Sequence, residues 1–355
     1  MLEFGSGVVH RGRQVTAEAR LAPFLVAVPA CSVLLTLSVQ LAAPGLTERY
    51  ALYPLLLGII LLGLPHGALD HLVPARLGLV WGRRPLGVAL YLLAYVTVAA
   101  LYLGLWLWHP LVAFGGFLAA TVWHWGQGDQ RFLEIFLKRQ RPTRWGAWVT
   151  LWVRGSLPIV LPLLAFPETA ESLFHHAAAG LGLPAMTPSL SAPLFVTLTF
   201  LLALGLSAYV LNAVRAAPNR RVLALDGAEI LLLILLFTLV PAYMSVGVYF
   251  IFWHSLRHLG RLLILRPQDA AQVARGRLRS PVKRLTIDLL PITFAALSLL
   301  TGFYLFNAAR VTSLEGFVAL YLILISALTK PHLVVVAMMD LEPKRVMQPV
   351  SSEIH

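Results

Sequence analysis

The sequence predicts an all-α protein, a polytopic integral membrane bundle of about ten transmembrane helices. Hydrophobic residues make up 58% of the chain and charged residues only 12%, whereas about 25% of the residues of a soluble globular protein are charged. The mean hydropathy is +0.77. Apolar runs such as 21–43, 86–108 and 193–214 are long enough to cross a bilayer core, which takes roughly 20 residues. These observations predict a protein of the cell membrane.

Proline and glycine punctuate the ends of the expected helices, as at Pro85, Pro110 and Pro193. The first apolar run exceeds the core of a signal peptide, which is about 7–15 residues, so we expect it to be a retained helix. It contains Cys31, the only cysteine, which excludes a disulfide within the chain. Residues 167–192 are expected to form a long loop. The expected helices are 21–43, 49–72, 86–108, 110–128, 145–166, 193–214, 222–240, 243–264, 286–308 and 316–340.

The basic residues predict the orientation of the chain. The formal charge of +12 is gathered in short clusters between apolar runs, which is the positive-inside pattern of cytoplasmic loops. This pattern indicates contact with anionic lipid headgroups and argues against a nucleic-acid partner. Residues 1–355 are expected to form one multi-pass domain, with cytoplasmic tails at 1–20 and 341–355. The expected cytoplasmic connections are 73–85, 129–144, 215–221 and 265–285.

Histidines within the apolar segments predict a metal site. Ionisable groups inside a membrane usually face the bundle interior, and neutral imidazole is the commonest protein metal ligand. At 1.5 Å per helical residue, all of these histidines fall in the cytoplasmic half of the membrane. The shared depth therefore predicts a histidine-lined metal site there. The five residues are His66, His124, His254, His258 and His332.

The spacing of the histidines divides them into roles. His254 and His258 are spaced i,i+4, which puts both side chains on one helical face, and His66 and His124 complete four ligands. His71 is turned about 140° away from His66 on an ideal helix, so we expect it beside the ligands. His332 follows Pro331, and three roles remain open for it: a metal ligand, a hydrogen bond to substrate, or a packed neutral histidine.

Acidic and aromatic residues accompany these motifs. Asp70 and Asp129 are expected either to accept the second ring N–H of a ligating histidine or to pair with loop arginines at the membrane surface. Asp226 and Glu229 are weaker candidates for the same roles. Lys330 is expected to pair with an acid or to extend to the cytoplasm. The aromatic residues predict a channel for a long apolar substrate, although aromatics are common near membrane interfaces. They are Trp123, Trp125, Tyr249, Phe250 and Trp253.

The motifs PHGALDH, WHWGQGD, WHSLRH and PHLVVV resemble those of the Brp/Blh family of β-carotene 15,15′-dioxygenases. The resemblance covers about residues 60–340, with the motifs in the expected order. It implies a non-haem Fe(2+) that cleaves the central double bond of β-carotene with O₂, giving two molecules of all-trans-retinal. The implied iron ligands are His66, His124, His254 and His258. It also implies membrane lipid as the surroundings and a functional link to a rhodopsin that binds retinal.

Other functions stay open at this point. Imidazole suits zinc, copper, iron and nickel alike, so residue spacing does not choose the metal. A di-metal desaturase or hydroxylase carries more histidines, in HxxxH and HxxHH boxes, and the histidines within these apolar segments supply one HxxxH. A transporter or a protein that binds carotenoid or retinal would use intramembrane histidines for protons or ligand contacts. Inverted repeats would favour a transporter, and the sequence has none that we detect.

Overall fold

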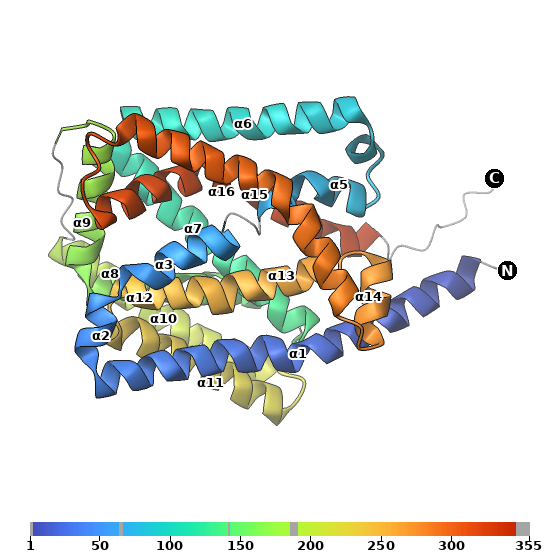
Figure 1. The fold of residues 1–355 in the computed structure, drawn as a ribbon. Coiled ribbons are helices and arrows are strands. Elements are labelled where there is room, and N and C mark those ends of the chain that lie inside the picture. The colour runs from blue at the N-terminus through green and yellow to red at the C-terminus, as the bar shows by residue number, and fades with distance from the viewer. Residues whose placement is uncertain (1–2, 64–66, 141–142, 185–190, 346–355) are drawn as a thin grey trace.

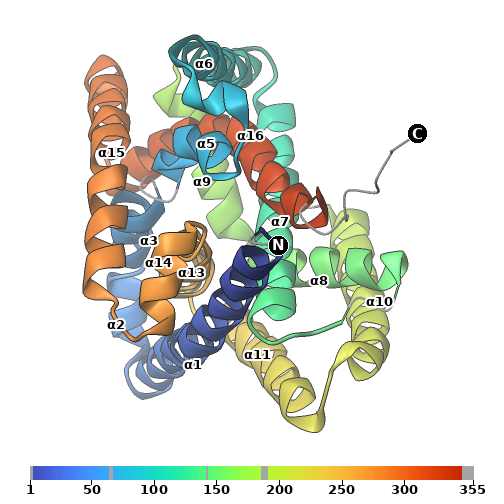
Figure 2. The same ribbon diagram turned by 90° about the vertical axis from the view of Figure 1, so that its right-hand side faces the viewer.

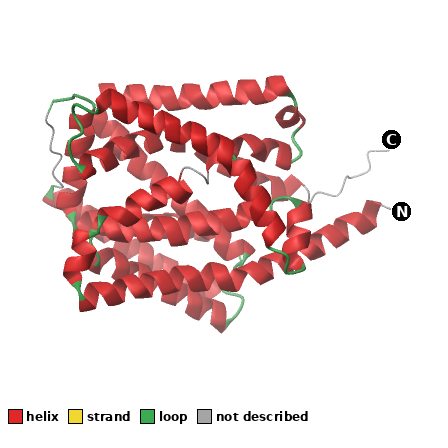
Figure 3. Cartoon of the chain, in the orientation of Figure 1, coloured by secondary structure: helices red, strands yellow, loops and turns green. Residues whose placement is uncertain are grey.

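The computed structural model describes residues 3–63, 67–140, 143–184 and 191–345. Within these residues the chain is helical and has no β-strand (Figure 3), which confirms the predicted all-α fold class. By length and composition, seven helices of this described part can cross a membrane. They are α1 (Glu3–Ala42), α6 (Pro85–Trp108), α8 (Arg144–Ala165), α10 (Ala192–Ala216), α11 (Arg220–Leu239), α15 (Arg279–Asn307) and α16 (Leu314–Arg345).

The expected count of ten spans is not confirmed by this measure, because several inner helices carry polar residues. Helix α7 (Pro110–Ile135) is long enough to span a bilayer, but it buries His124, Gln127 and Asp129, and polar residues lower the hydropathy by which a span is recognised. The remaining inner helices are α3 (Leu52–Gly58), the π-helix η1 (Ile59–Gly63), α12 (Ala242–Val248), the π-helix η4 (Tyr249–Ser255) and α13 (Leu256–Leu263).

The loop predicted over 167–192 is wrong in its first half, because Pro167–Gly180 forms helix α9. Proline stands at the start of this helix, and Glu168 lies in its first turn. Both favour a helix N-terminus, since proline is preformed for the first turn and a carboxylate interacts favourably with the helix dipole. Polar residues such as His175 interrupt the hydrophobic pattern by which a helix is recognised. The alanines that follow them favour a helix, because alanine is the best helix former.

Helical structure also extends into segments that were expected to be tails or connections. Helix α1 begins at Glu3, well before the predicted start of the first span. A short helix, α14 (Pro267–Ala274), lies within the predicted connection 265–285. In place of the one helix predicted over 49–72, the described residues of that range form α3, the π-helix η1 and the 3-10 helix η2 (Asp70–Leu72), and the preceding residues form α2 (Pro44–Arg49).

Two glycines bring α7 and α8 into backbone contact. A Cβ atom at Gly126 would lie 1.9 Å from the carbonyl oxygen of Leu151, and one at Gly155 would lie 1.8 Å from that of Val122. No larger residue fits at either position without moving a helix. The close approach sets Asp129 of α7 beside Arg154 of α8, which are hydrogen-bonded.

The helices α12, η4 and α13 run through the middle of the bundle, with α1 and α11 on one side and α6 and α16 on the other (Figure 1). Turned by 90°, the bundle shows α15 along one edge and α6 at the neighbouring corner (Figure 2). The largest buried cluster of apolar side chains packs η4 against α11 and includes Leu233, Phe237, Tyr249 and Trp253. The residues of η4 are thereby held from one side by a close-packed core.

Candidate active site

Four histidines of the described chain meet inside the bundle, although they come from three segments that are far apart in sequence. They are His124 of α7, His254 of η4, His258 of α13 and His332 of α16, and all are buried. The ring centroid of His124 lies 4.8 Å from that of His254, 4.8 Å from that of His332 and 6.4 Å from that of His258. The rings of His258 and His332 are 5.7 Å apart. We call these four residues the histidine cluster.

Local helix geometry sets the positions of His254 and His258. Their rings are stacked at an angle of 13° with centroids 6.4 Å apart, as two residues spaced i,i+4 on one helical face should be. His254 lies in the π-helix η4, and π-helical turns are rare and frequent at functional sites. A second π-helix, η1, ends at Gly63. The predicted ligand His66 lies outside the described residues.

Helix α16 contributes His332, whose ring is held by a carboxylate. The Nδ1 atom of His332 lies 2.8 and 2.9 Å from the two carboxylate oxygens of Asp70. Because an ionised carboxylate only accepts hydrogen bonds, Nδ1–H is the donor and Nε2 is the acceptor nitrogen of this ring. The hydroxyl of Tyr95 on α6 lies 3.1 Å from Asp70 and 3.2 Å from the carbonyl oxygen of Leu328. A carboxylate that fixes a tautomer in this way is a common partner of metal-ligating histidine.

The donor set fits a transition metal in its chemistry. Buried imidazoles suit first-row metals, and the thiol of Cys31 is exposed on α1, away from the cluster. In the described residues, however, no three His, Cys, Asp or Glu side chains are by themselves arranged to hold a metal ion. A metal site here therefore needs a further ligand, for which the sequence predicts His66.

The histidine cluster adjoins a cavity of about 420 Å³ with almost entirely apolar walls. His124, His254 and His332 line it, and so do Asp70 and His71. Further lining residues come from α6, α7, α8, α9, α12, α15 and α16, and most of them are apolar. A cavity of this kind binds a ligand through shape and hydrophobic contact, with a few polar groups at one place.

The predicted channel aromatics lie in three different surroundings. Trp125 and Phe250 line the cavity, and their ring centroids lie 5.6 and 6.0 Å from that of His254. Tyr249 and Trp253 are buried in the core on the other side of η4. Trp123 packs against tryptophans on the outer face of α8 and is not among the described residues that line the cavity. A position next to a histidine in sequence therefore does not decide which aromatics face the cavity.

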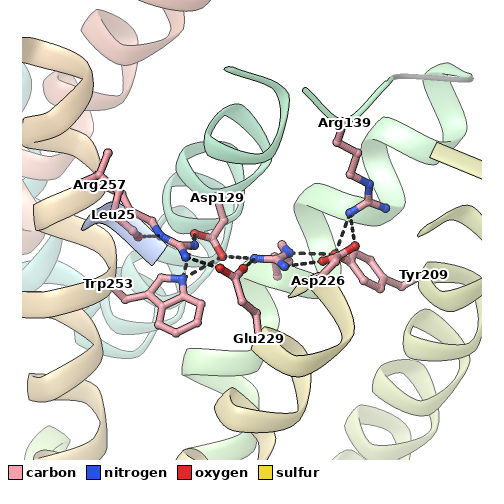
Figure 4. A network of polar contacts seen from close by, with 9 residues as sticks. Leu25, Asp129, Arg139, Tyr209, Asp226, Glu229, Trp253 and Arg257 are labelled. Atoms are coloured by element: carbon pink, nitrogen blue, oxygen red, sulfur yellow. Dashed lines mark hydrogen bonds and ion pairs between the residues drawn. The ribbon is translucent and has the colours of Figure 1, made fainter. Parts of the chain in front are cut away.

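Asp129 contacts arginines inside the bundle. Its carboxylate accepts hydrogen bonds from Arg154 at 2.8 Å, from Arg257 at 2.9 Å and from the indole N–H of Trp253 at 3.1 Å. These arginines are buried within the span α8 and within α13, in the bundle interior and not in the loops. Figure 4 shows Asp129 beside Arg257 and Trp253. Among the contacts of Asp129 within the described residues, none is with a ring of the histidine cluster.

Arg154 is the centre of a larger set of ion pairs that includes the two weaker candidates from the sequence. It is fully buried and donates to Asp129, to Asp226 at 2.5 Å and to Glu229 at 3.0 Å. Arg257 donates to Glu229 at 2.5 Å. At the far end of the set in Figure 4, Arg139 donates to Asp226 and to the hydroxyl of Tyr209, both at 2.8 Å. We call the following set the ionic network: Asp129, Arg139, Arg154, Asp226, Glu229 and Arg257.

Sequence reasoning missed the arginines of this network. Arg154 interrupts the apolar run 145–166, and Arg257 lies between the two histidines of WHSLRH. A charged residue inside an apolar segment is itself a signal for a buried partner or a functional site. The pairing was hidden because Asp226, on another helix, has no sequence relation to Arg154.

His71 and Lys330 contact backbone carbonyl groups. The Nδ1 atom of His71 lies 2.9 Å from the carbonyl oxygen of Ala68, and its ring lines the cavity. Lys330 was expected to pair with an acid or to reach the cytoplasm. Its ammonium group instead donates to the carbonyl oxygen of Gly116 at 2.8 Å and lies 4.3 Å from the ring centroid of Tyr102. An aromatic face and a carbonyl oxygen together partly replace the solvation of a cation.

Comparison with known proteins supports the resemblance seen in the motifs. The sequence model of the family "Beta-carotene 15,15′-dioxygenase" matches residues 57–340. A protein of Halobacterium salinarum, named as probable beta-carotene 15,15′-dioxygenase Blh, is 34% identical over 342 residues, which is 93% of this chain and 94% of that protein. The probable beta-carotene 15,15′-dioxygenase Brp of the same organism is 28% identical over 80% of this chain and 82% of its own. No solved structure matches the chain significantly.

Proposed function

The chain belongs to the β-carotene 15,15′-dioxygenase family, and from this premise we propose that it cleaves β-carotene with O₂ into two molecules of all-trans-retinal. In this reaction the central 15,15′ double bond breaks, and each of its two carbons takes up one oxygen atom as an aldehyde. The observation that carries the proposal is the meeting of the buried histidine cluster with an apolar cavity. A hydrocarbon substrate needs such a cavity. Its oxidation by O₂ also needs a metal ion or cofactor, because side chains alone do not activate O₂.

We propose Fe(2+) as that metal ion, held by His124, His254 and His258 together with His66. Support comes from the buried imidazole donors, from the absence of a thiolate near them, and from the family to which the chain belongs. When bound, ferrous iron would supply the binding and activation of O₂. His332, with its Nδ1–H held by Asp70, is placed beside the same rings as a positioning or additional donor residue.

The side chains of the cavity would bind and orient the polyene. Trp125 and Phe250 line the cavity next to His254. A polyene lying against their rings therefore has its double bonds beside the histidine cluster. This is catalysis by positioning, in which a fixed geometry lowers the barrier. The apolar walls also keep water away from the reacting bond. The described residues that line the cavity include no serine or cysteine, and the reaction needs no such nucleophile.

The membrane setting supports the same substrate. Both β-carotene and O₂ dissolve in hydrocarbon, and the described helices include spans with largely lipid-exposed surfaces, such as α6 and α10. We place the protein in the cell membrane with both termini on the cytoplasmic side, where the basic connections fall. Retinal released into the same membrane would be available to a retinal-binding rhodopsin.

The proposal is tested by producing the chain in a bacterium that accumulates β-carotene and measuring retinal by chromatography. Retinal is expected from the wild type and from His109→Ala, whose histidine is exposed at the end of α6. None is expected from His254→Ala. Iron measured in the purified wild type should fall on treatment with a chelator, and activity should return with Fe(2+). Apocarotenals of other lengths would show that a different double bond is cleaved. Well-folded, iron-loaded protein without any product would favour a transporter or a carotenoid-binding protein.

A further inference from the structure

The cavity beside the histidine cluster reaches the outer surface of the bundle between α6 and α15. On α6 the cavity is lined by Tyr91, Leu92, Tyr95 and Val96. The second pair follows the first by four residues, or about one helical turn, so all four side chains share one face of the helix. Leu92 is 39% exposed and Val96 63% exposed. Residues that line the cavity are thus also part of the outer surface, which means that the cavity is open at this place.

Helix α15 forms the other side of the opening. Its lining residues are Ile292, Ala295, Ala296 and Leu299, spaced i, i+3, i+4 and i+7 as one face of a helix requires. Leu299 is 53% exposed. The two central positions are alanines, the smallest side chains that a helix carries without glycine, so little side-chain volume stands between the cavity and the outside. In Figure 2, α15 runs along one edge of the bundle and α6 lies at the neighbouring corner.

The composition of α6 and α15 places this opening in hydrocarbon. Both helices are long and apolar enough to span a membrane. Among the residues of α6 only Ala99 and Trp106 are buried, and exposed leucines and valines cover the rest of its length. In a bilayer, side chains of this kind contact lipid tails. The opening therefore joins the lipid phase to the cavity, and a substrate passing through it would not meet water.

We propose that the carotenoid enters the cavity sideways from the bilayer, between α6 and α15, past Ala295 and Ala296. This inference rests on the proposed function for the identity of the substrate. A carotenoid is a long hydrocarbon, and exposing it to water on the way to the site would oppose the hydrophobic effect. The same face of α6 bears Tyr95, whose hydroxyl contacts Asp70, so the opening leads directly to the residue that holds His332.

The test narrows the opening with Ala296→Trp, and separately with Leu92→Trp from the α6 side. Ala94→Trp is the matched control, because Ala94 is exposed on α6 and is not among the residues that line the cavity. With β-carotene supplied in vesicles, kcat/KM should fall at least tenfold in both narrowed variants and stay within about twofold of the wild type in Ala94→Trp. The iron content should equal that of the wild type.

A second measurement does not depend on cleavage. Each variant is purified from cells that make no carotenoid and is exposed briefly, without oxygen, to vesicles loaded with β-carotene; the carotenoid bound per chain is measured by its absorption. Binding should be fast in the wild type and Ala94→Trp, and at least tenfold slower in the narrowed variants. Wild-type binding with no retinal formed once oxygen is admitted would support this route and contradict the proposed function. Unchanged binding rates and kcat/KM in both narrowed variants would overturn the route.

Discussion

The histidine cluster and the ionic network are two buried polar regions that share the same helices but are built differently. Helix α7 supplies His124 to the first and Asp129 to the second, and α13 supplies His258 and Arg257. In the ionic network, carboxylate and guanidinium groups are hydrogen-bonded to one another at 2.5–3.0 Å. In the histidine cluster, the imidazole rings lie 4.8–6.4 Å apart and border a cavity. The ionic network is therefore closed, whereas the histidine cluster is open to the cavity.

This difference indicates a division of roles. Three arginines and three carboxylates of the described chain form the network, so its formal charges cancel. Charges inside a bilayer are costly unless they are paired, and each charged group of the network has a partner of opposite charge within it. Its effect is to fix α7, α8, α11 and α13 relative to one another. The histidines on α7 and α13 are then held in register by charges that take no part in the chemistry.

The largest effect is expected from Arg154→Met, which removes the centre of the network. Asp129, Asp226 and Glu229 would each lose a partner at once. Breaking a buried ion pair on one side costs about 3–5 kcal/mol of folding free energy, so the variant should be recovered as little or no monodisperse protein. Size-exclusion chromatography and thermal unfolding in detergent measure this. Arg144→Met, at the exposed start of the same helix, should behave like the wild type.

A stable, monodisperse Arg154→Met protein with normal retinal production would contradict the structural role of the network. The double substitution that also replaces Asp226 offers a finer check. Because removing both partners of a buried pair is far less damaging than removing one, Arg154→Met with Asp226→Asn should recover part of the lost stability.

The contrast between the two regions also shows what the sequence can predict. The histidines were found because imidazoles are rare in apolar segments, and their shared depth followed from counting residues along helices. The same counting does not tell which helices are neighbours, so Arg154 could not be assigned to Asp226 on α11. Nor does it predict the π-helix η4 that carries His254, or the close approach at Gly126. These depend on packing between elements distant in sequence.

The expected count of ten spans was not confirmed for a related reason. Hydropathy finds helices whose surfaces face lipid, such as α6 and α10. It finds less readily a helix such as α7, which turns Gln127 and Asp129 inward, or a helix such as α9, which contains polar residues. The inner helices that carry the candidate site are therefore the ones that composition describes least well.

A smaller effect is expected beside the histidine cluster, from Asp70→Asn. The amide can still accept from Nδ1–H of His332 but lacks the negative charge that fixes the tautomer. Loss of such a carboxylate typically costs about 10–100-fold in metal affinity or activity. Retinal production and iron content should fall in that range while the unfolding temperature stays near that of the wild type. Asp288→Asn, which removes a partly exposed partner of Arg76, should change neither.

If Asp70→Asn instead lowered stability as much as Arg154→Met, Asp70 would belong functionally to the structural region, and the division of roles would be wrong.

The smallest effect is expected from Tyr95→Phe, which sharpens the comparison further. The substitution removes the hydroxyl that lies 3.1 Å from Asp70 and keeps the ring that lines the cavity. One hydrogen bond contributes about 1 kcal/mol, equivalent to about a fivefold change in rate, so kcat should fall a few-fold while KM for β-carotene is unchanged. Tyr91→Phe is the matched control, because the hydroxyl of Tyr91 lines the same cavity and forms no hydrogen bond within the described residues. A fall in kcat for Tyr95→Phe alone would locate the effect in the contact with Asp70, whereas equal changes in both variants would assign it to the shape of the cavity wall.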